Sequence, residues 1–331
     1  MSFSIQEASK VLAQKFLMQE GIAGVSHQSR QITIYIETPE MAAKIPSTLM
    51  GFPVKKVVTG RFYKLTALPE GKTGRTIAGL EASKTTKWRP APGGVSVGHY
   101  QITAGTLSTR VYDTATKAKL FLSNNHVLAN CNQGKPGDPI LQPGPYDGGA
   151  DPADRIGTLE RFVEIKQPPD TNLVDAAVGK PLRDTDLSDE VLDIGVVTSV
   201  EEARVGMTVA KSGRTTCYKT ATITDVNATV KVWDYPWGYS IFEDQILTTY
   251  LGAPGDSGSL CVNTATKAAV GLLFAGSDTD TVLNKMTNVV KLLNINFGAP
   301  PPPRPAAIPM ISFLPMMLGT VWFGSNVEKG S

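Results

Sequence analysis

The stretch Gly255-Asp256-Ser257-Gly258-Ser259 surrounds a serine with small residues, and it follows a bend that contains glycine and proline. Glycine lets the backbone turn sharply and lets a reacting group approach closely. In such a turn the amides of Gly255 and Ser257 can point at one oxygen atom, which is the geometry of an oxyanion hole. The stretch therefore predicts Ser257 as a nucleophile, with Gly255 and Ser257 as the donors of the oxyanion hole.

A serine nucleophile needs a base that takes its proton and a carboxylate that orients this base. Of the three histidines in the chain, His126 ends an apolar run and is the predicted base, whereas His27 and His99 lie in segments without such partners and are interpreted as structural. Asp175 has apolar neighbours on both sides, so its carboxylate needs a buried partner. Asp154 is the rival for the orienting role, but the prolines and glycines around it indicate a loop.

Two further motifs support this set, Leu-Ser-Asn-Asn-His-Val at 122–127 and Lys-Ser-Gly-Arg-Thr-Thr at 211–216. With them the chain resembles the trypsin/chymotrypsin-like serine peptidase family, in an intracellular microbial branch, over about residues 88 to 298. The order His126, Asp175, Ser257 is that of chymotrypsin rather than subtilisin. The resemblance implies a serine endopeptidase that hydrolyses protein or peptide bonds through an acyl-enzyme. The alternative is a catalytically latent binding or scaffold protein with the same fold.

The resemblance also implies two antiparallel six-stranded β-barrels, and the residue pattern favours a mainly β chain. Short runs rich in Val, Ile, Thr, Tyr and Phe alternate with turns rich in Gly, Pro, Asn and Asp, which is typical of strands. One late helix is predicted over 282–294, with its apolar residues on one face. The predicted strands are residues 101–111, 118–122, 155–165, 205–211, 220–232, 239–249 and 268–274.

The resemblance implies a substrate pocket as well. The residue six before the nucleophile, which forms the base of the primary pocket in the family, is Leu251. A leucine offers no counter-charge, so cleavage after Lys or Arg is disfavoured. Phe274, Ala275 and Gly276 would form the pocket wall and the edge that pairs with the substrate backbone.

Asp256 needs a partner of its own. In many family members a new N-terminal amine, made by cleavage, pairs with the aspartate before the nucleophile. No cleavage motif of that kind is recognisable upstream of Val95. Arg214 and nearby hydroxyl groups are the candidate partners of Asp256, and without one the oxyanion hole would be collapsed.

The remaining chain divides into three parts. Residues 1–66 are predicted as a small α/β unit, with a helix near 5–16, a hairpin over 21–37, a short helix over 39–49 and a last strand over 52–65. Residues 67–92 are predicted as a linker and 93–298 as the peptidase domain. A unit as small as 1–66 buries little alone, so it is expected to pack on the peptidase or to form a homo-oligomer.

Composition excludes some partners. With 41% apolar and 19% charged residues and a net charge of +2, the chain has no basic surplus for nucleic acid. The carboxylates of Asp147, Asp151 and Asp154 suit either a calcium loop or a solvated turn, and the missing bidentate Glu favours the turn. No metal and no cofactor is therefore expected. Three cysteines, Cys131, Cys217 and Cys261, indicate reduced core thiols rather than a disulfide framework, and one bridge between Cys217 and Cys261 stays open as the alternative.

The two ends suggest a location. The first residues lack the basic and apolar blocks of a signal peptide, so a cytoplasmic protein is expected. Residues 299–331 begin as a Pro-rich spacer and continue as an uncharged apolar tail at 306–324. The length of this tail fits one membrane span, but its prolines fit that poorly. Membrane contact through 306–324 and a strand that covers the peptidase both stay open.

Overall fold

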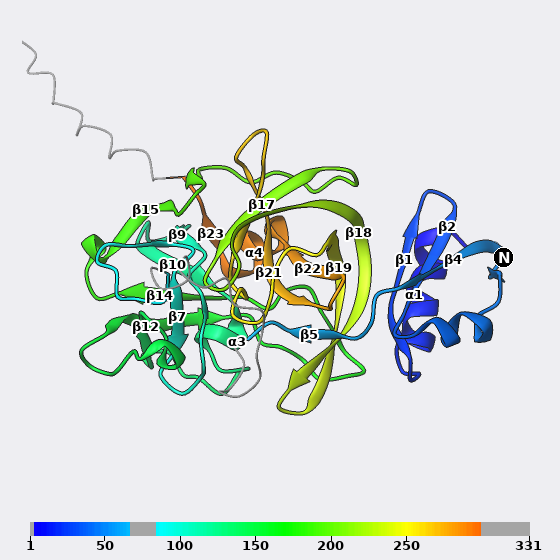
Figure 1. Cartoon of the computed structure of the whole chain (residues 1–331), viewed down its shortest axis with the longest axis horizontal. Helices are drawn as coiled ribbons and strands as arrows, with labels where there is room; N and C mark the ends of the chain where they lie inside the picture. Colours follow the sequence, from blue (N-terminus) through cyan, green and yellow to red (C-terminus); the bar gives the residue numbers. More distant parts are fainter. Residues whose placement is uncertain (1–2, 67–83, 299–331) are drawn as a thin grey trace, which may run out of the picture. The chain divides into compact units, whose positions relative to one another are not determined.

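The computed structural model describes residues 3–66 and 84–298, and all of them belong to one compact unit. The protein is mainly β, with a helix and strands at its N-terminal end (Figure 1). The predicted fold class is confirmed, because two rings of antiparallel strands make up the body of the molecule. The apolar tail at 306–324 and most of the predicted linker lie outside the described residues.

The C-terminal barrel, which carries Ser257, is closed. Its strands pair in the order β19-β22-β21-β20-β17-β18, and a further antiparallel pairing of β18 with β19 completes the ring. The residues that face its interior are buried Val, Ile, Leu and Phe side chains, as strand alternation requires. The six strands are β17 (Thr208–Gly213), β18 (Cys217–Tyr235), β19 (Gly238–Thr249), β20 (Leu260–Asn263), β21 (Ala269–Gly276) and β22 (Asp280–Lys285).

The N-terminal barrel, which carries His126, closes in a similar way. Its strands pair in the order β9-β10-β14-β12-β11-β7-β8. The chain runs from β8 into β9 with one break, where Leu107 and Ser108 donate hydrogen bonds to the strands on either side. Its strands are β7 (Ser96–His99), β8 (Gly105–Thr106), β9 (Thr109–Asp113), β10 (Lys119–Ser123), β11 (Pro139–Leu141), β12 (Arg155–Phe162) and β14 (Ala177–Pro181).

Short elements complete this part of the chain. A three-stranded sheet joins β6 (Ala91–Gly93), β15 (Leu187–Val191) and β16 (Gly195–Val196). Strand β13 (Thr171–Asn172) pairs with β19, and β23 (Ile295–Asn296) pairs with β9. The helices are α3 (Asn125–Leu128), α4 (Met286–Leu293) and the 3-10 turns η2 (Pro145–Asp147) and η3 (Asp184–Asp186).

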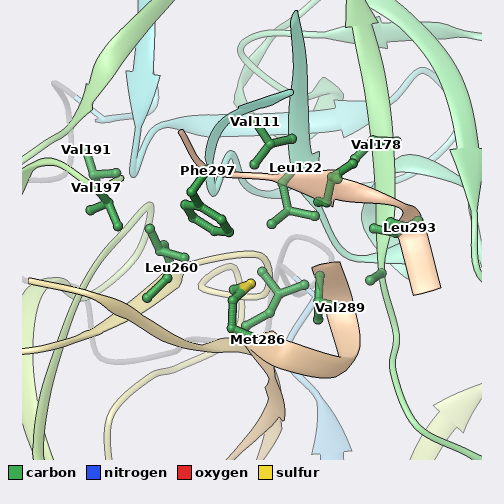
Figure 2. Close-up of a cluster of buried hydrophobic side chains, with 14 of the residues drawn as sticks. Val111, Leu122, Val178, Val191, Val197, Leu260, Met286, Val289, Leu293 and Phe297 are labelled. Atoms are coloured by element: carbon green, nitrogen blue, oxygen red, sulfur yellow. The ribbon is translucent and has the colours of Figure 1, made fainter. Parts of the chain in front are cut away.

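A buried apolar cluster joins the two barrels. Figure 2 shows Val111, Leu122 and Val178 of the N-terminal barrel facing Leu260 of the C-terminal barrel and Met286 of helix α4. Every one of these side chains is fully buried. The cluster contains Leu122, near the end of β10, and Leu260, at the start of β20. It therefore holds the segment that carries His126 and the segment that carries Ser257 in place relative to each other.

The N-terminal unit packs on the C-terminal barrel. Helix α1 begins at a capping box formed by Ser4 and Glu7 and buries its apolar side against the sheet. Strand β1 pairs with β18, and the hydroxyls of Ser26 and Tyr35 donate to the Asp225 carboxylate of β18 at 2.8 and 2.6 Å. The unit contains α1 (Ile5–Phe16), β1 (Ile22–Gln28), β2 (Gln31–Ile36), η1 (Pro39–Lys44), β3 (Thr48–Leu49) and β4 (Phe52–Val58).

Several predicted elements are wrong in extent. The short helix predicted over 39–49 ends at Lys44, and residues 48–49 form strand β3. The strand predicted over 101–111 is divided into β8 and β9. The last strand of the unit is not continuous over 52–65, because the chain turns at Gly60, whose φ is +75°. Its first half, β4, pairs with β2, whereas its second half, β5 (Phe62–Lys64), pairs with β18 and β21 of the barrel. The predicted helix over 282–294 begins four residues later, because its first residues belong to β22 and pair with β19 and β21.

No helix among residues 3–66 and 84–298 is long and apolar enough to cross a membrane.

Candidate active site

The Ser257 turn lies between β19 and β20. Gly255 and Gly258 adopt φ values of +100° and +96°, in the left-handed region that favours glycine. A Cβ atom on Gly255 would lie 2.2 Å from Thr215 Oγ1, so no larger residue fits there. Ser257 is fully buried, and its hydroxyl donates to the Phe274 carbonyl at 3.0 Å.

The structure brings His126 and Asp175 into direct contact. His126 lies in the short helix α3, just after β10, and its Nδ1 is 2.6 Å from Asp175 Oδ2. The His126 backbone N–H donates to the other carboxylate oxygen at 3.1 Å, which fixes the orientation of the pair. Burial alone would raise the pKa of Asp175, but the imidazole and the hydrogen bonds from His126 and Tyr235 hold it below its ordinary value.

His126 Nε2 is buried and has no hydrogen-bond partner among the residues that the structure describes. The serine turn is close by, because a Cβ placed on Gly105 would lie 2.5 Å from Val127 Cγ2 and 2.9 Å from the Ser257 carbonyl oxygen. Val127, which follows His126, and the backbone of Ser257 thus both pack against Gly105 of β8. The Ser257 hydroxyl faces Phe274 rather than the free imidazole nitrogen.

Tyr235 contacts the candidate site, and the sequence did not predict this contact. Its hydroxyl donates to Asp175 Oδ2 at 2.7 Å, from the end of β18. Tyr235 is buried, and burial together with the adjacent Asp175 charge raises the pKa of its hydroxyl well above its ordinary value. A tyrosine at a strand end beside Pro236 looks like an ordinary turn, so the sequence contained no signal for this contact.

Asp256 has a cation as its partner, but it is not Arg214. Lys211 Nζ lies 3.0 Å from Asp256 Oδ2, and both side chains are fully buried. The Thr216 hydroxyl donates to the same carboxylate at 2.6 Å, as the prediction of nearby hydroxyls allowed. Arg214 binds Asp147 instead, because its guanidinium points out of the turn toward that loop. Burial would raise the pKa of Asp256, but Lys211 and these hydrogen bonds hold it below its ordinary value.

The two amides predicted as the oxyanion hole converge on one oxygen atom. Gly255 N–H donates to the Leu65 carbonyl at 2.7 Å, and Ser257 N–H donates to the same oxygen at 3.4 Å. The turn therefore presents both amides to one acceptor oxygen. This oxygen comes from the chain itself, from the residue that follows β5.

The predicted pocket wall contacts the same segment. Leu65 N–H donates to the Phe274 carbonyl at 3.0 Å. Ala275 and Gly276 pair antiparallel with Lys64 and Tyr63, respectively. Leu65 is 6% exposed and belongs to the same buried apolar cluster as Leu251, the predicted pocket base.

The rival residues have other partners. Asp154 pairs with Lys87, Asp151 with Arg155 and Asp147 with Arg214. In the described ranges no three carboxylate, histidine or cysteine side chains are grouped so that they could hold a metal ion.

The other histidines also lie apart from Asp175. His99 pairs with Asp138 at 3.1 Å, and His27 lies in β1. All three cysteines are free, and burial raises the pKa of Cys131 and of Cys261 to about 12, as expected for reduced core thiols.

No protein-family model and no curated protein matches the sequence. Among solved structures, Nocardiopsis protease (NAPase) is 19% identical, with a TM-score of 0.45, over 62% of this chain and 98% of that chain. Thermobifida fusca Protease A is 18% identical, with a TM-score of 0.45, over 63% and 98%. Cellulomonas bogoriensis chymotrypsin is 20% identical, with a TM-score of 0.44, over 63% and 98%. Over about 62% of its length, the chain is similar in structure to chymotrypsin-like serine proteases.

Proposed function

We propose that the chain is a serine endopeptidase that hydrolyses protein or peptide bonds. Ser257 is the nucleophile, His126 the general base and acid, and Asp175 the residue that orients His126. The observation that carries the proposal is the buried His126–Asp175 pair. The second ring nitrogen of His126 has no partner among the described residues, and the next residue, Val127, meets the Ser257 backbone at Gly105. A proton acceptor held in one orientation is what a serine needs in order to attack a carbonyl carbon.

The reaction would proceed in two halves. In the first, Ser257 Oγ turns from the Phe274 carbonyl toward His126, loses its proton to Nε2 and attacks the substrate carbonyl. The amides of Gly255 and Ser257 stabilise the oxyanion, and His126 then protonates the leaving amine. In the second half, water attacks the acyl-enzyme by the same route. These steps use only side chains and backbone amides, so the proposal includes no cofactor.

The proposed specificity follows from Leu251 and its neighbours. Leu251 is buried in an apolar cluster with Leu65, and a leucine offers a Lys or Arg side chain no counter-charge. We expect cleavage after a medium or large apolar residue, and we expect Leu251→Asp to shift the preference toward basic residues. A peptide-library profile of the unmodified protein that is dominated by Arg would contradict this pocket assignment.

A catalytically latent binding protein is the second candidate. The observation that favours it is the Leu65 carbonyl in the oxyanion hole, since a substrate cannot use the hole while Leu65 occupies it. The two candidates differ in whether the serine becomes reactive when the hole is vacated.

A fluorophosphonate probe tests the proposal, because labelling requires an activated serine and an open oxyanion hole. We expect labelling of the Leu65→Asp variant, whose cleft should be vacated, and none when Ser257→Ala is added. Hydrolysis of a peptide anilide with leucine before the scissile bond should follow the same pattern. A folded Leu65→Asp variant that neither reacts with the probe nor cleaves the anilide would favour the latent protein.

A further inference from the structure

Residues 62–65 lie in the cleft in the register of a substrate. The Leu65 carbonyl accepts from the Gly255 and Ser257 amides, and its N–H donates to Phe274. Upstream of it, Lys64 and Tyr63 pair antiparallel with strand β21. These polar contacts at both sides of Leu65 place its carbonyl group in the oxyanion hole. The peptide bond at this carbonyl is Leu65–Thr66.

Two side chains of this segment fill apolar sites. Leu65 is buried with the cluster that contains Leu251, and Gly276 leaves room for it, because a Cβ at Gly276 would lie 3.2 Å from Leu65 Cδ1. Phe62 is completely buried in a second cluster that contains Phe242 and Phe274. Tyr63, between them, is 40% exposed. Phe62 and Leu65, three positions apart, are therefore the two anchoring side chains of the segment, and the side chains between them are less buried.

The chain holds this segment in place from its N-terminal side. Strand β4 pairs with β2, and the unit that contains both is joined to the barrel by the pairing of β1 with β18. Only residues 59–61 separate β4 from β5. Such a short connection gives β5 a high effective concentration at its own cleft, so a separate molecule competes poorly for it.

We infer that Leu65–Thr66 is a bond that this protein cleaves in its own chain, with Leu65 as the residue before the cut and Phe62 as a second anchor. The inference rests on the proposed peptidase function. It adds a processing site, and it names leucine preceded at the fourth position by an aromatic residue as the preferred substrate class.

The step balances with groups already present and one water molecule. Ser257 Oγ forms an ester with the Leu65 carbonyl carbon while its proton passes to His126 Nε2. The Leu65–Thr66 C–N bond breaks, and that proton passes to the Thr66 nitrogen. Water then hydrolyses the ester and restores Ser257. The products are residues 1–65 with a new carboxylate and a chain that begins with the Thr66 amine.

The experiment follows the full-length protein by intact-mass spectrometry after rapid refolding from denaturant. We expect fragments that end at Leu65 and begin at Thr66, formed at a rate independent of protein concentration. Ser257→Ala should stay intact. Cleavage only at another bond, or a rate proportional to protein concentration, would overturn the inference.

The apolar pocket disfavours the charge of Leu65→Asp, so the segment should leave the cleft and cleavage at this bond should slow by about 100-fold or more. Leu182→Asp is the matched control, because Leu182 is 55% exposed outside the cleft, and it should be processed at the wild-type rate. Should Leu65→Asp fail to fold, Thr66→Pro leaves Leu65 in its pocket and converts the bond into a tertiary amide. This variant should remain uncut at that bond, and wild-type processing in it would contradict the assignment.

Turnover of the leucine anilide, measured on every variant, separates this inference from the proposed function. An intact wild-type chain together with an anilide-cleaving Leu65→Asp variant would overturn self-cleavage and leave the peptidase function standing. Folded variants that cut neither the anilide nor themselves would overturn both. Both proposals are supported when the wild-type protein is cut at Leu65–Thr66 and the Leu65→Asp variant stays uncut at that bond but hydrolyses the anilide.

Discussion

Asp175 and Asp256 are both completely buried carboxylates, each beside a nitrogen base and a hydroxyl group. Asp175 accepts from His126 and Tyr235, and Asp256 accepts from Lys211 and Thr216. For both, burial acts to raise the pKa of the carboxyl group and the partners lower it below its ordinary value. The electrostatic pattern is the same at the two positions.

Lys211 and His126 differ in whether they have an unused hydrogen-bonding group. Lys211 Nζ also donates to the Thr216 hydroxyl at 2.6 Å and to the Cys217 carbonyl at 3.1 Å, so its three protons are all in use. His126 has a second ring nitrogen without a partner among the described residues. The Lys211–Asp256 pair, whose donors are all in use, can only hold the surrounding backbone in place. The His126–Asp175 pair has a ring nitrogen that can still accept a proton. We therefore expect the Asp175 pair to affect chemistry and the Asp256 pair to affect stability.

The largest expected effect is on catalysis, from Asp175→Asn. An amide at this position favours the wrong imidazole tautomer, so kcat for the leucine anilide should fall by on the order of 10⁴-fold while the fold is retained. Asp154→Asn is the matched control, because Asp154 pairs with Lys87 in a loop. Steady-state kinetics in the Leu65→Asp background provide the measurement. A residual activity close to that of Asp154→Asn would remove Asp175 from the site.

Next in size is the stability effect of Lys211→Met. It leaves the Asp256 carboxylate buried without its counter-charge, which should lower the free energy of unfolding by about 3–5 kcal/mol. Urea denaturation measures this change. Lys180→Met, at an exposed lysine, should stay within about 0.5 kcal/mol of the wild-type value. Equal stabilities of the two variants would show that Asp256 does not depend on Lys211.

A smaller effect is expected from Tyr235→Phe, which removes one hydrogen bond from Asp175 and leaves His126 in contact with it. Loss of a hydrogen bond to a charged acceptor predicts a decrease in kcat of about 10-fold, with KM little changed. Tyr218→Phe, at a 45% exposed residue of the same strand, should retain full activity. Identical kinetics for both variants would confine Tyr235 to a packing role.

The smallest effect concerns acid. Because the pKa of Asp256 is lower in the folded protein than its ordinary value, its contribution to stability is present above that value and is lost as pH falls through the folded-state pKa. The free energy of unfolding should thus decline below about pH 4. In Lys211→Met, burial without the counter-charge should raise the pKa of Asp256 toward or above its ordinary value, so the decline in acid should become smaller or reverse. Urea titrations at a series of pH values test this difference, and coincident profiles would oppose it.

The sequence predicted those features that depend only on residues close together in the chain. The glycines around Ser257 and the apolar neighbours of Asp175 are visible in single segments, and alternation predicted most strands. Tyr235 and Lys211 were missed because their contacts join positions far apart in the chain, at the end of β18 and in the interior of β17. Strand β5 was missed for another reason: a continuous β-rich run does not reveal that its two halves pair with different sheets.

The internal Lys211–Asp256 pair has a consequence for control. In a peptidase whose oxyanion hole is ordered by a new N-terminal amine, cleavage of the chain changes the conformation of the catalytic turn and thereby activates the enzyme. Here the ammonium is supplied from within the barrel, and the amides already converge on an oxygen atom. In the proposed peptidase, ligands therefore compete for the cleft, and each of them must displace the tethered Leu65. The apparent affinity of a ligand equals its intrinsic affinity multiplied by the fraction of molecules whose cleft is free. A substitution that weakens the binding of Leu65 should therefore increase the apparent affinity of every active-site inhibitor by the same factor.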